Sequence, residues 1–392
     1  MKLFRLAAAI TALLLTGCAS TDITIPVHTA QVLPDPSQES TAEESAPQQS
    51  SEPEGGIAER AAAILAEMTS EEKAGQLVLA RYPGTDEAAN AVSQYSPGGF
   101  TLFAEDTQDK TPSQLAQELT DINGGSDIPL LFAVDEEGGS VVRISKFSQY
   151  REERFPAQSE VLSSGGLDGV RSDAKEKSEL LGSLGFNMIL APVCDLPRTE
   201  QDYIYSRAYG TDVDEVSAAV SAAVSQYVEC GVVSTLKHFP GYGDNLDTHT
   251  GISIDERPLT ELEQLDLQPF RSGIAAGAPV VMVSHNIVKC VNSELPGSLA
   301  PEMYSLLRDD IGFDGVIMTD DLSMDAIGEY CGENEAAVTA FLAGADLICC
   351  TDMTSAVGAL REAVDSGKIT QQRLDSSVLR ILEMKISFGI IK

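Results

Sequence analysis

The chain has 392 residues, with 60 acidic against 26 basic side chains and a formal net charge of −34. An excess of acidic groups on this scale excludes a nucleic-acid-binding protein, because contacts with the phosphate backbone require Lys and Arg. It fits an exported protein whose substrate is neutral or mixed in charge.

The first eighteen residues predict export. Lys2 and Arg5 precede an apolar run over 6–15, which is too short for a permanent membrane span. The run ends in Leu-Thr-Gly-Cys at 15–18, which resembles a bacterial lipobox. We therefore predict that 1–18 is a lipoprotein signal peptide and that cleavage leaves a lipid on Cys18. The protein would then be anchored to the extracytoplasmic face of the cell membrane by this lipid alone. The alternative is a cytoplasmic protein with a chance apolar N-terminus.

Residues 19–56 differ sharply from the rest of the chain. Ser, Thr, Gln, Pro and Glu dominate, and no apolar periodicity is visible. Such a segment cannot bury enough surface to offset its chain entropy, so we predict a disordered linker. Its root-mean-square reach is on the order of 35 Å.

The remaining residues, 57–392, alternate between short apolar runs and longer segments with helical spacing. Helical segments are expected from 61–65 onward, after Thr69-x-x-Glu72 and after Thr260-x-x-Glu263, both of which match a capping box. Apolar strands separated by helices indicate a parallel sheet covered on both faces. Eight runs favour a (β/α)8 TIM barrel over a doubly wound sheet. The runs cover 76–82, 98–103, 130–135, 187–193, 232–238, 279–286, 315–320 and 345–350.

The cysteines do not indicate a metal site. No pair has C-x-x-C spacing, and several lie in or beside apolar runs. We expect buried small side chains in preference to disulfides, and no structural metal. Apart from Cys18, the cysteines of the chain are Cys194, Cys230, Cys290, Cys331, Cys349 and Cys350.

Polar side chains follow several of the predicted strands. Strands often end in a polar turn residue, but functional groups of a barrel gather at the carboxyl ends of its strands. We therefore predict one shared polar mouth. Its candidates are Asp135, Asp195, Lys237, His238, His285 and Asp320.

Four motifs in fixed order resemble glycoside hydrolase family 3, and within it the single-domain β-N-acetylglucosaminidases. The resemblance covers essentially all of 57–392. The motifs are Val-Asp-Glu-Glu-Gly-Gly at 134–139, Lys-His-Phe-Pro-Gly at 237–241, Asp-Thr-His at 247–249 and Thr-Asp-Asp-Leu-Ser-Met at 319–324.

The resemblance assigns the catalytic roles. Asp320 matches the nucleophile that forms a covalent glycosyl-enzyme, and the adjacent Asp321 is the competitor whose plain interpretation is a turn residue. His249 matches the general acid and base. Asp247 would orient the His249 ring and favour its imidazolium form.

The resemblance also implies a sugar-binding set and no cofactor. A buried salt bridge is the alternative for either arginine, and packing is the alternative for His285. The set is Asp135, Arg143, Arg207, Lys237, His238 and His285.

The chain departs from the family pattern at three places. Ser140 replaces the first arginine of a Gly-Gly-Arg-Val-x-Arg stretch, and Tyr242 replaces the usual His of Pro-Gly-His-Gly. The loop over 243–247 is one residue shorter than the pattern, which puts the reach of His249 in question.

We expect a monomeric, retaining exo-β-N-acetylhexosaminidase that removes terminal N-acetylglucosamine from peptidoglycan fragments or chito-oligosaccharides. One alternative is a family 3 β-glucosidase, which the Asp-x-His pair at 247–249 disfavours. The other is a sugar-binding lipoprotein without catalysis, which the presence of Asp320, Asp247 and His249 disfavours.

Overall fold

The computed structural model describes residues 56–245, 247, 248, 251–328 and 330–392. The predicted signal peptide, Cys18 and all of the predicted linker except Gly56 lie outside the described residues, as does His249. The residues from Glu54 to Lys392 cluster as one compact unit.

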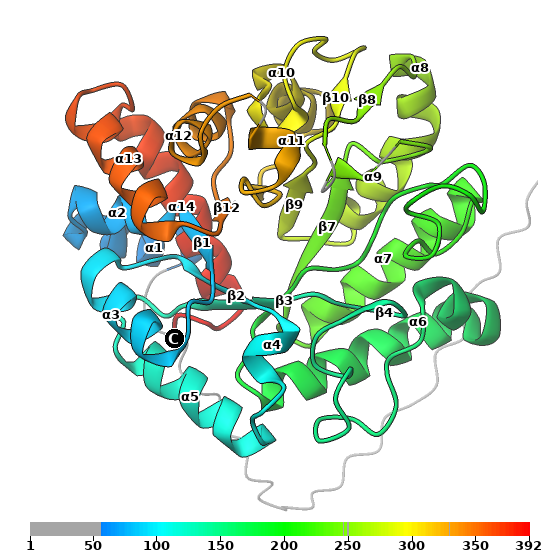
Figure 1. Cartoon of the computed structure of the whole chain (residues 1–392), viewed down its shortest axis with the longest axis horizontal. Helices are drawn as coiled ribbons and strands as arrows, with labels where there is room; N and C mark the ends of the chain where they lie inside the picture. Colours follow the sequence, from blue (N-terminus) through cyan, green and yellow to red (C-terminus); the bar gives the residue numbers. More distant parts are fainter. Residues whose placement is uncertain (1–55, 246, 249–250, 329) are drawn as a thin grey trace, which may run out of the picture. The chain divides into compact units, whose positions relative to one another are not determined.

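Eight parallel strands form one sheet at the centre of this unit (Figure 1), in the order β11-β9-β7-β6-β3-β2-β1-β12. The two end strands meet through a parallel bridge between Met318 and Leu347. The sheet therefore closes into the predicted barrel, and a doubly wound sheet is excluded. The strands are β1 (Val78–Arg81), β2 (Gly99–Leu102), β3 (Leu131–Val134), β6 (Met188–Ile189), β7 (Val233–Phe239), β9 (Val280–Val283), β11 (Val316–Thr319) and β12 (Ile348–Cys350).

Helices surround the strands (Figure 1). The longer ones are α1 (Ile57–Glu67), α2 (Ser70–Gln76), α3 (Thr85–Tyr95), α5 (Pro112–Gly124), α6 (Gln158–Ser183), α7 (Val213–Glu229), α9 (Leu267–Ala275), α12 (Glu333–Ala343), α13 (Met353–Asp365) and α14 (Gln371–Ser387). The short ones are α4 (Ala104–Thr107), α8 (Leu259–Glu261), η2 (Leu262–Asp266), η3 (Gly297–Leu299), α10 (Pro301–Ser305), η4 (Leu306–Ile311) and α11 (Asp325–Gly328).

One of the two predicted capping boxes is present. The Thr69 hydroxyl accepts from the amide of Glu72, and the Glu72 carboxylate accepts from the Thr69 amide at 2.7 Å. The second prediction was wrong: α8 begins at Leu259 after Pro258, and Thr260 lies inside the helix. Pro258 accounts for the difference, because its ring fixes a backbone conformation that suits a helix start.

Two small strand pairs extend the barrel. β4 (Glu136–Gly138) follows β3 directly and pairs antiparallel with β5 (Val141–Val142). β8 (Ile254–Asp255), in the connection after β7, pairs with β10 (Ile287–Val288), which follows β9. These pairs fix the segments that leave the carboxyl ends of three barrel strands.

Cys194, Cys230, Cys290, Cys331 and Cys349 are free thiols, as expected from their sequence context. Cys194, Cys349 and Cys350 are buried, and Cys230, Cys290 and Cys331 are partly buried. Within the described ranges, no helix has both the length and the apolar character that a membrane span requires. In that same part of the chain, no three His, Cys, Asp or Glu side chains are grouped as metal ligands.

Candidate active site

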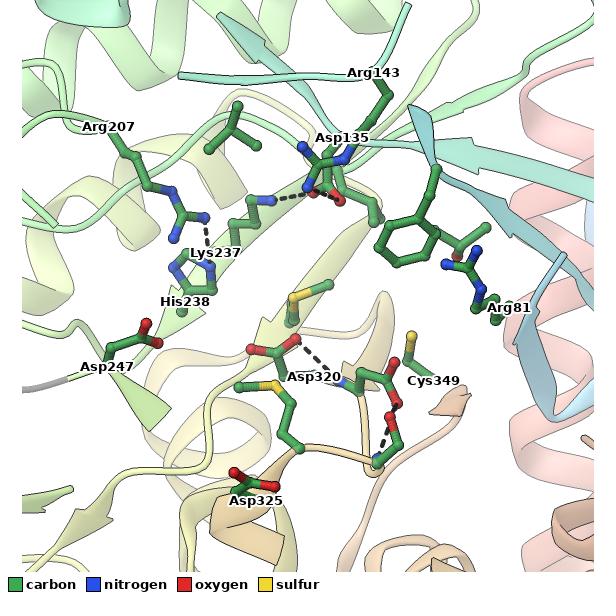
Figure 2. A pocket seen from close by; sticks show the side chains of 18 of the residues that line it. Arg81, Asp135, Arg143, Arg207, Lys237, His238, Asp247, Asp320, Asp325 and Cys349 are labelled. Carbon is green, nitrogen blue, oxygen red and sulfur yellow. Dashed lines mark hydrogen bonds and ion pairs between the residues drawn. The ribbon is translucent and has the colours of Figure 1, made fainter. Parts of the chain in front are cut away.

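A pocket of about 580 Å³ opens where the barrel strands end (Figure 2). Its wall contains the residue after β3, two residues within β7 and the residue after β11. The side chains predicted from the sequence that line it are Asp135, Arg143, Arg207, Lys237, His238, Asp247 and Asp320. The ends of β3, β7 and β11 thus share one pocket, whereas Asp195 and His285, the other two strand-end candidates, do not line it.

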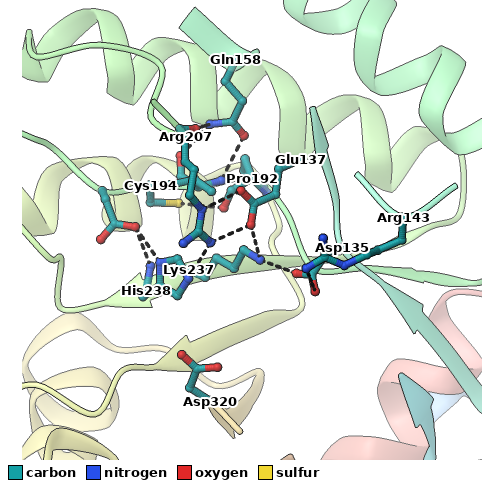
Figure 3. A network of polar contacts seen from close by, with 12 residues as sticks. Asp135, Glu137, Arg143, Gln158, Pro192, Cys194, Arg207, Lys237, His238 and Asp320 are labelled. Atoms are coloured by element: carbon teal, nitrogen blue, oxygen red, sulfur yellow. Dashed lines mark hydrogen bonds and ion pairs between the residues drawn. The ribbon is translucent and has the colours of Figure 1, made fainter. Parts of the chain in front are cut away.

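A buried network of ion pairs forms one wall of the pocket (Figure 3). Lys237 Nζ lies 2.7 Å from Asp135 Oδ1 and 2.6 Å from Glu137 Oε1. Arg207 donates to the same Glu137 carboxylate from Nε at 2.9 Å and from Nη2 at 2.8 Å. Glu137, in β4, therefore holds two cations that come from β7 and from the loop before α7.

The network keeps its members charged. Burial opposes ionisation of Glu137, but the charges of Lys237 and Arg207 outweigh it and hold the pKa of Glu137 well below its usual range. Burial likewise disfavours the Lys237 ammonium, yet Asp135 and Glu137 raise the pKa of Lys237. Glu137 and Lys237 therefore stay charged, and the wall presents these fixed charges to a ligand.

The hydrogen bonds of His238 define its tautomer. Its Nε2 lies 3.1 Å from Arg207 Nη2, and its Nδ1 lies 2.8 Å from Asp195 Oδ2. A guanidinium only donates and a carboxylate only accepts, so Nε2 accepts and Nδ1 carries the proton. His238 is therefore a neutral ring whose orientation is fixed from both sides.

Arg143 enters the pocket beside Asp135. Its Nη2 lies 3.7 Å from Asp135 Oδ2, and within the described residues its Nε has no hydrogen-bond partner. The loop that presents it is fixed by Glu136, whose buried carboxylate accepts from the amides of Arg143 at 2.9 Å and Ile144 at 2.8 Å. Glu136 also accepts from the Ser145 hydroxyl.

The two adjacent aspartates after β11 have different surroundings. The carboxylate of Asp320 points toward the ion-pair network (Figure 3) and accepts from the Asp321 amide. The carboxylate of Asp321 accepts from the amide and the hydroxyl of Ser323, at 2.9 and 2.8 Å. Asp321 thus closes the turn after the strand, as its plain interpretation predicts, although it also lines the pocket.

His285 is not among the residues that line the pocket, and its surroundings match the packing role that was the alternative to a substrate contact. The ring is fully buried. Its Nε2 donates to the backbone oxygen of Asp321 at 2.9 Å, because a carbonyl only accepts, and its Nδ1 lies 2.7 Å from Ser298 Oγ. His285 lies two residues beyond the end of β9, where its side chain supports the turn under Asp320.

The loop after β7 brings Asp247 to the pocket from the side of His238 (Figure 2). Burial, and with it the nearby charge of Asp247, raises the pKa of the Tyr203 hydroxyl. Thr248 is buried, and its hydroxyl lies 2.6 Å from that of Tyr242. His249, predicted as the acid and base, lies outside the described residues.

Several functional side chains had no predicted role. Asp195 was noted only as a strand-end residue, and Glu137 only as part of a motif. Tyr203 comes from a loop without any sequence signal. Further parts of the wall that the sequence did not single out are Arg81, Thr101, Phe103, Met282, Asp325 and Cys349.

Comparisons with known proteins agree with this geometry. The family model described as the glycosyl hydrolase family 3 N terminal domain matches residues 69–384. Beta-hexosaminidase LpqI of Mycobacterium tuberculosis is 30% identical over 335 residues, which cover 83% of this chain and 84% of that protein.

Two solved structures are similar over most of the chain. A family 3 beta-N-acetylglucosaminidase from Paenibacillus sp. str. FPU-7 superposes with a TM-score of 0.78 at 32% identity, covering 83% of this chain and 64% of that chain. The M tuberculosis LpqI structure has a TM-score of 0.76 at 30% identity, covering 83% and 96%. Because the family model matches most of the chain and a relative is 30% identical over most of both proteins, the chain belongs to glycosyl hydrolase family 3.

Proposed function

We propose that the protein is a retaining exo-β-N-acetylhexosaminidase that releases terminal N-acetylglucosamine from peptidoglycan fragments or chito-oligosaccharides. The observation that carries the proposal is that Asp320 faces the ion-pair network of Lys237, Glu137 and Arg207 across a single pocket. The names of the similar proteins, a beta-hexosaminidase and a beta-N-acetylglucosaminidase, favour this substrate class.

The wall residues suit a sugar at its non-reducing end. Asp135 offers acceptors for ring hydroxyls, while Lys237 and Arg207 offer donors. Because each of these groups is also held by a buried ion pair, the wall is pre-organised before the sugar arrives.

The first chemical step is attack of Asp320 on the anomeric carbon. The bond from that carbon to the leaving oxygen breaks as a carboxylate oxygen of Asp320 bonds to it, through a positive, oxocarbenium-like transition state. In the same step His249, oriented by Asp247, gives its proton to the leaving oxygen. The product is a covalent glycosyl-enzyme with the anomeric configuration inverted.

The second step restores the configuration. A water molecule attacks the anomeric carbon while neutral His249 takes its proton, and the bond to Asp320 breaks. The imidazolium form of His249 and the Asp320 carboxylate are both regenerated, so the step balances. Two inversions give retention.

The function is tested with a chromogenic N-acetyl-β-glucosaminide beside its glucoside counterpart. We expect hydrolysis of the first at a kcat/KM well above that of the second. A preference for the glucoside would make the protein a β-glucosidase, and hydrolysis of neither would leave a sugar-binding protein. Proton NMR of the first-formed sugar tests the mechanism, because retention requires that the β-anomer appear before mutarotation.

We further propose that the enzyme is exported and held at the extracytoplasmic face of the membrane by a lipid on Cys18. The apolar run and the lipobox-like residues at 15–18 support this. A linker over 19–56 would then let the catalytic domain sample glycan near the membrane.

A further inference from the structure

The loop that follows β7 is firmly fixed at its start. The amide of Tyr242 donates to Asp195 Oδ1 at 2.7 Å, and Arg257 Nη2 donates to the backbone oxygen of Gly241 at 2.8 Å. Gly243 has a φ of +56°, and a Cβ at this position would lie 2.0 Å from Arg257 Nη1. The positive φ and the close approach of Arg257 both favour glycine at this turn.

Tyr242 connects this fixed start with the end of the loop. Its ring is 1% exposed and packs edge-on against the His238 ring, with centroids 5.1 Å apart. Its hydroxyl lies 2.6 Å from Thr248 Oγ1. A rigid ring therefore joins a residue of the sugar-binding wall to the residue next to Asp247.

Tyr203 forms a second connection. Arg207 Nη1 donates to the Tyr203 hydroxyl at 3.2 Å, and the Asp247 carboxylate is near enough to that hydroxyl for its charge to help raise the pKa of Tyr203. Because a guanidinium only donates and a carboxylate only accepts, the Tyr203 hydroxyl accepts from Arg207 and keeps its own proton available to Asp247. The rings of Tyr203 and Tyr242 also touch, with centroids 5.7 Å apart. Both tyrosines thus lie between the sugar-binding wall and the loop that carries Asp247.

We propose that Tyr203 and Tyr242 are positioning residues that couple the sugar-binding wall to the loop carrying Asp247. The proposal rests on the proposed function, in which Asp247 orients the acid and base. Arg207 and His238 contact both the ion-pair network and one tyrosine each, so a sugar bound at the wall would also steady the loop. Tyr242 and the shortened loop are departures from the family pattern, so this coupling belongs to this chain's version of the loop.

Tyr203→Phe tests the contact with Asp247. We expect kcat/KM for substrates with poor leaving groups to fall by about 10- to 100-fold, the usual effect of losing one hydrogen bond to a charged group. Substrates with good leaving groups should lose little, because they need little protonation. Equal losses for all leaving groups would mean that Tyr203 merely supports Arg207, and would overturn the proposal.

A double-mutant cycle tests the contact with Thr248. If Tyr242 acts through its hydroxyl contact with Thr248, then Tyr242→Phe, Thr248→Val and the double variant should all lower kcat/KM from the wild-type value by nearly the same factor. Additive losses would show that the two residues act independently. Tyr205→Phe is the matched control, because within the described part of the chain the Tyr205 hydroxyl makes no hydrogen bond and should be dispensable.

Amide hydrogen exchange followed by mass spectrometry tests the coupling without any turnover. A peptide covering 241–248 should exchange faster in the Tyr203→Phe and Tyr242→Phe variants than in the wild type or in Tyr205→Phe. Unchanged exchange in all variants would overturn the proposal even if the enzyme is a hexosaminidase. Faster exchange in an enzyme that cleaves neither chromogenic substrate would uphold the coupling while the proposed function fails.

Discussion

The backbone amide of Asp321 donates a hydrogen bond to Oδ1 of Asp320 at 2.9 Å. The contact separates the roles of two carboxylates that adjoin in the sequence. One is steadied by its neighbour's backbone and faces the ion-pair network, and the other is turned to Ser323 to close the turn. His285 supports the same turn from below through the Asp321 carbonyl.

Asp320→Asn should abolish turnover and leave folding intact. The amide keeps the size of the side chain but removes the charge that attacks the anomeric carbon and stabilises the positive transition state. Asp321→Asn is the matched variant and should keep substantial activity, because its oxygen can still accept from Ser323. Steady-state kinetics and thermal unfolding of both variants check this. An inactive Asp321→Asn beside an active Asp320→Asn would move the nucleophile by one residue.

Glu137→Gln should weaken both substrate binding and stability. Removing this charge leaves Lys237 and Arg207 as buried cations that have lost a shared counter-ion. Breaking a buried pair of this kind costs about 3–5 kcal/mol in the free energy of unfolding, and the displaced cations should raise KM. Urea unfolding and kinetics measure the two effects.

The control for this substitution is Glu176→Gln. Glu176 forms an exposed ion pair with Arg151 at 2.9 Å, and such pairs contribute about 1 kcal/mol or less. Equal destabilisation by the two substitutions would contradict the role given to Glu137.

Lys385, in α14, gives the stability a defined pH dependence. The ammonium is fully buried with Gln76 Oε1 at 2.8 Å and the Gly98 carbonyl at 3.0 Å, and burial lowers the pKa of Lys385 to about 7. In the unfolded chain a lysine titrates near 10.4. Between these values the unfolded state binds the extra proton, so the free energy of unfolding rises with pH, by up to about 1.4 kcal/mol per pH unit.

Lys385→Met should remove that slope. Between pH 7.5 and 9.5, the free energy of unfolding in urea should change less with pH in the variant than in the wild type. The difference in slope is the test, since the lost hydrogen bonds also change the absolute stability. Lys368→Met, at an exposed position, should keep the wild-type slope. Parallel pH curves for Lys385→Met and the wild type would refute the assignment.

Cys18→Ser should abolish lipid attachment and move the protein from the membrane fraction to the soluble fraction. The specific activity of the soluble domain should not change, because the residues that line the catalytic pocket all lie between Arg81 and Cys349. Labelling with a fatty-acid analogue, followed by fractionation, checks this. Cys290→Ser should stay anchored. A Cys18→Ser protein that still carries lipid would refute the proposed anchor.

The barrel was predictable because each strand is a short run of apolar residues. β3, β9 and β11 are buried at every position. Because fully buried strands consist mainly of apolar residues, they can be recognised in the sequence as short apolar runs. The strand-end residues Asp135 and Asp320 were predictable for a related reason, since the end of an apolar run fixes where the next polar side chain emerges.

The second layer of the site was not predictable in this way. Glu137 and Arg207 are 70 residues apart, and Tyr203 reaches Asp247 from a different loop. Such contacts depend on how separate connections fold over the barrel, which no local pattern encodes. His285 shows the same limit: its position after a strand was visible, but the direction of its side chain, under the turn instead of into the pocket, was not.

The proposed pair of Asp247 and His249 gives the last prediction. If His249 is both acid and base, His249→Ala should slow glycosylation and deglycosylation, by about 10²–10⁴-fold where proton transfer matters. Asp247→Asn should give a smaller defect of the same kind. Without the Asp247 charge the imidazolium form of His249 is less favoured, so the pKa of His249 should fall. The basic limb of the kcat/KM profile should then move to lower pH. An unchanged profile in Asp247→Asn, with equal losses for all leaving groups in His249→Ala, would place the proton donor elsewhere. Asp244, which lies in the same loop and is exposed, is then the carboxylate to replace next.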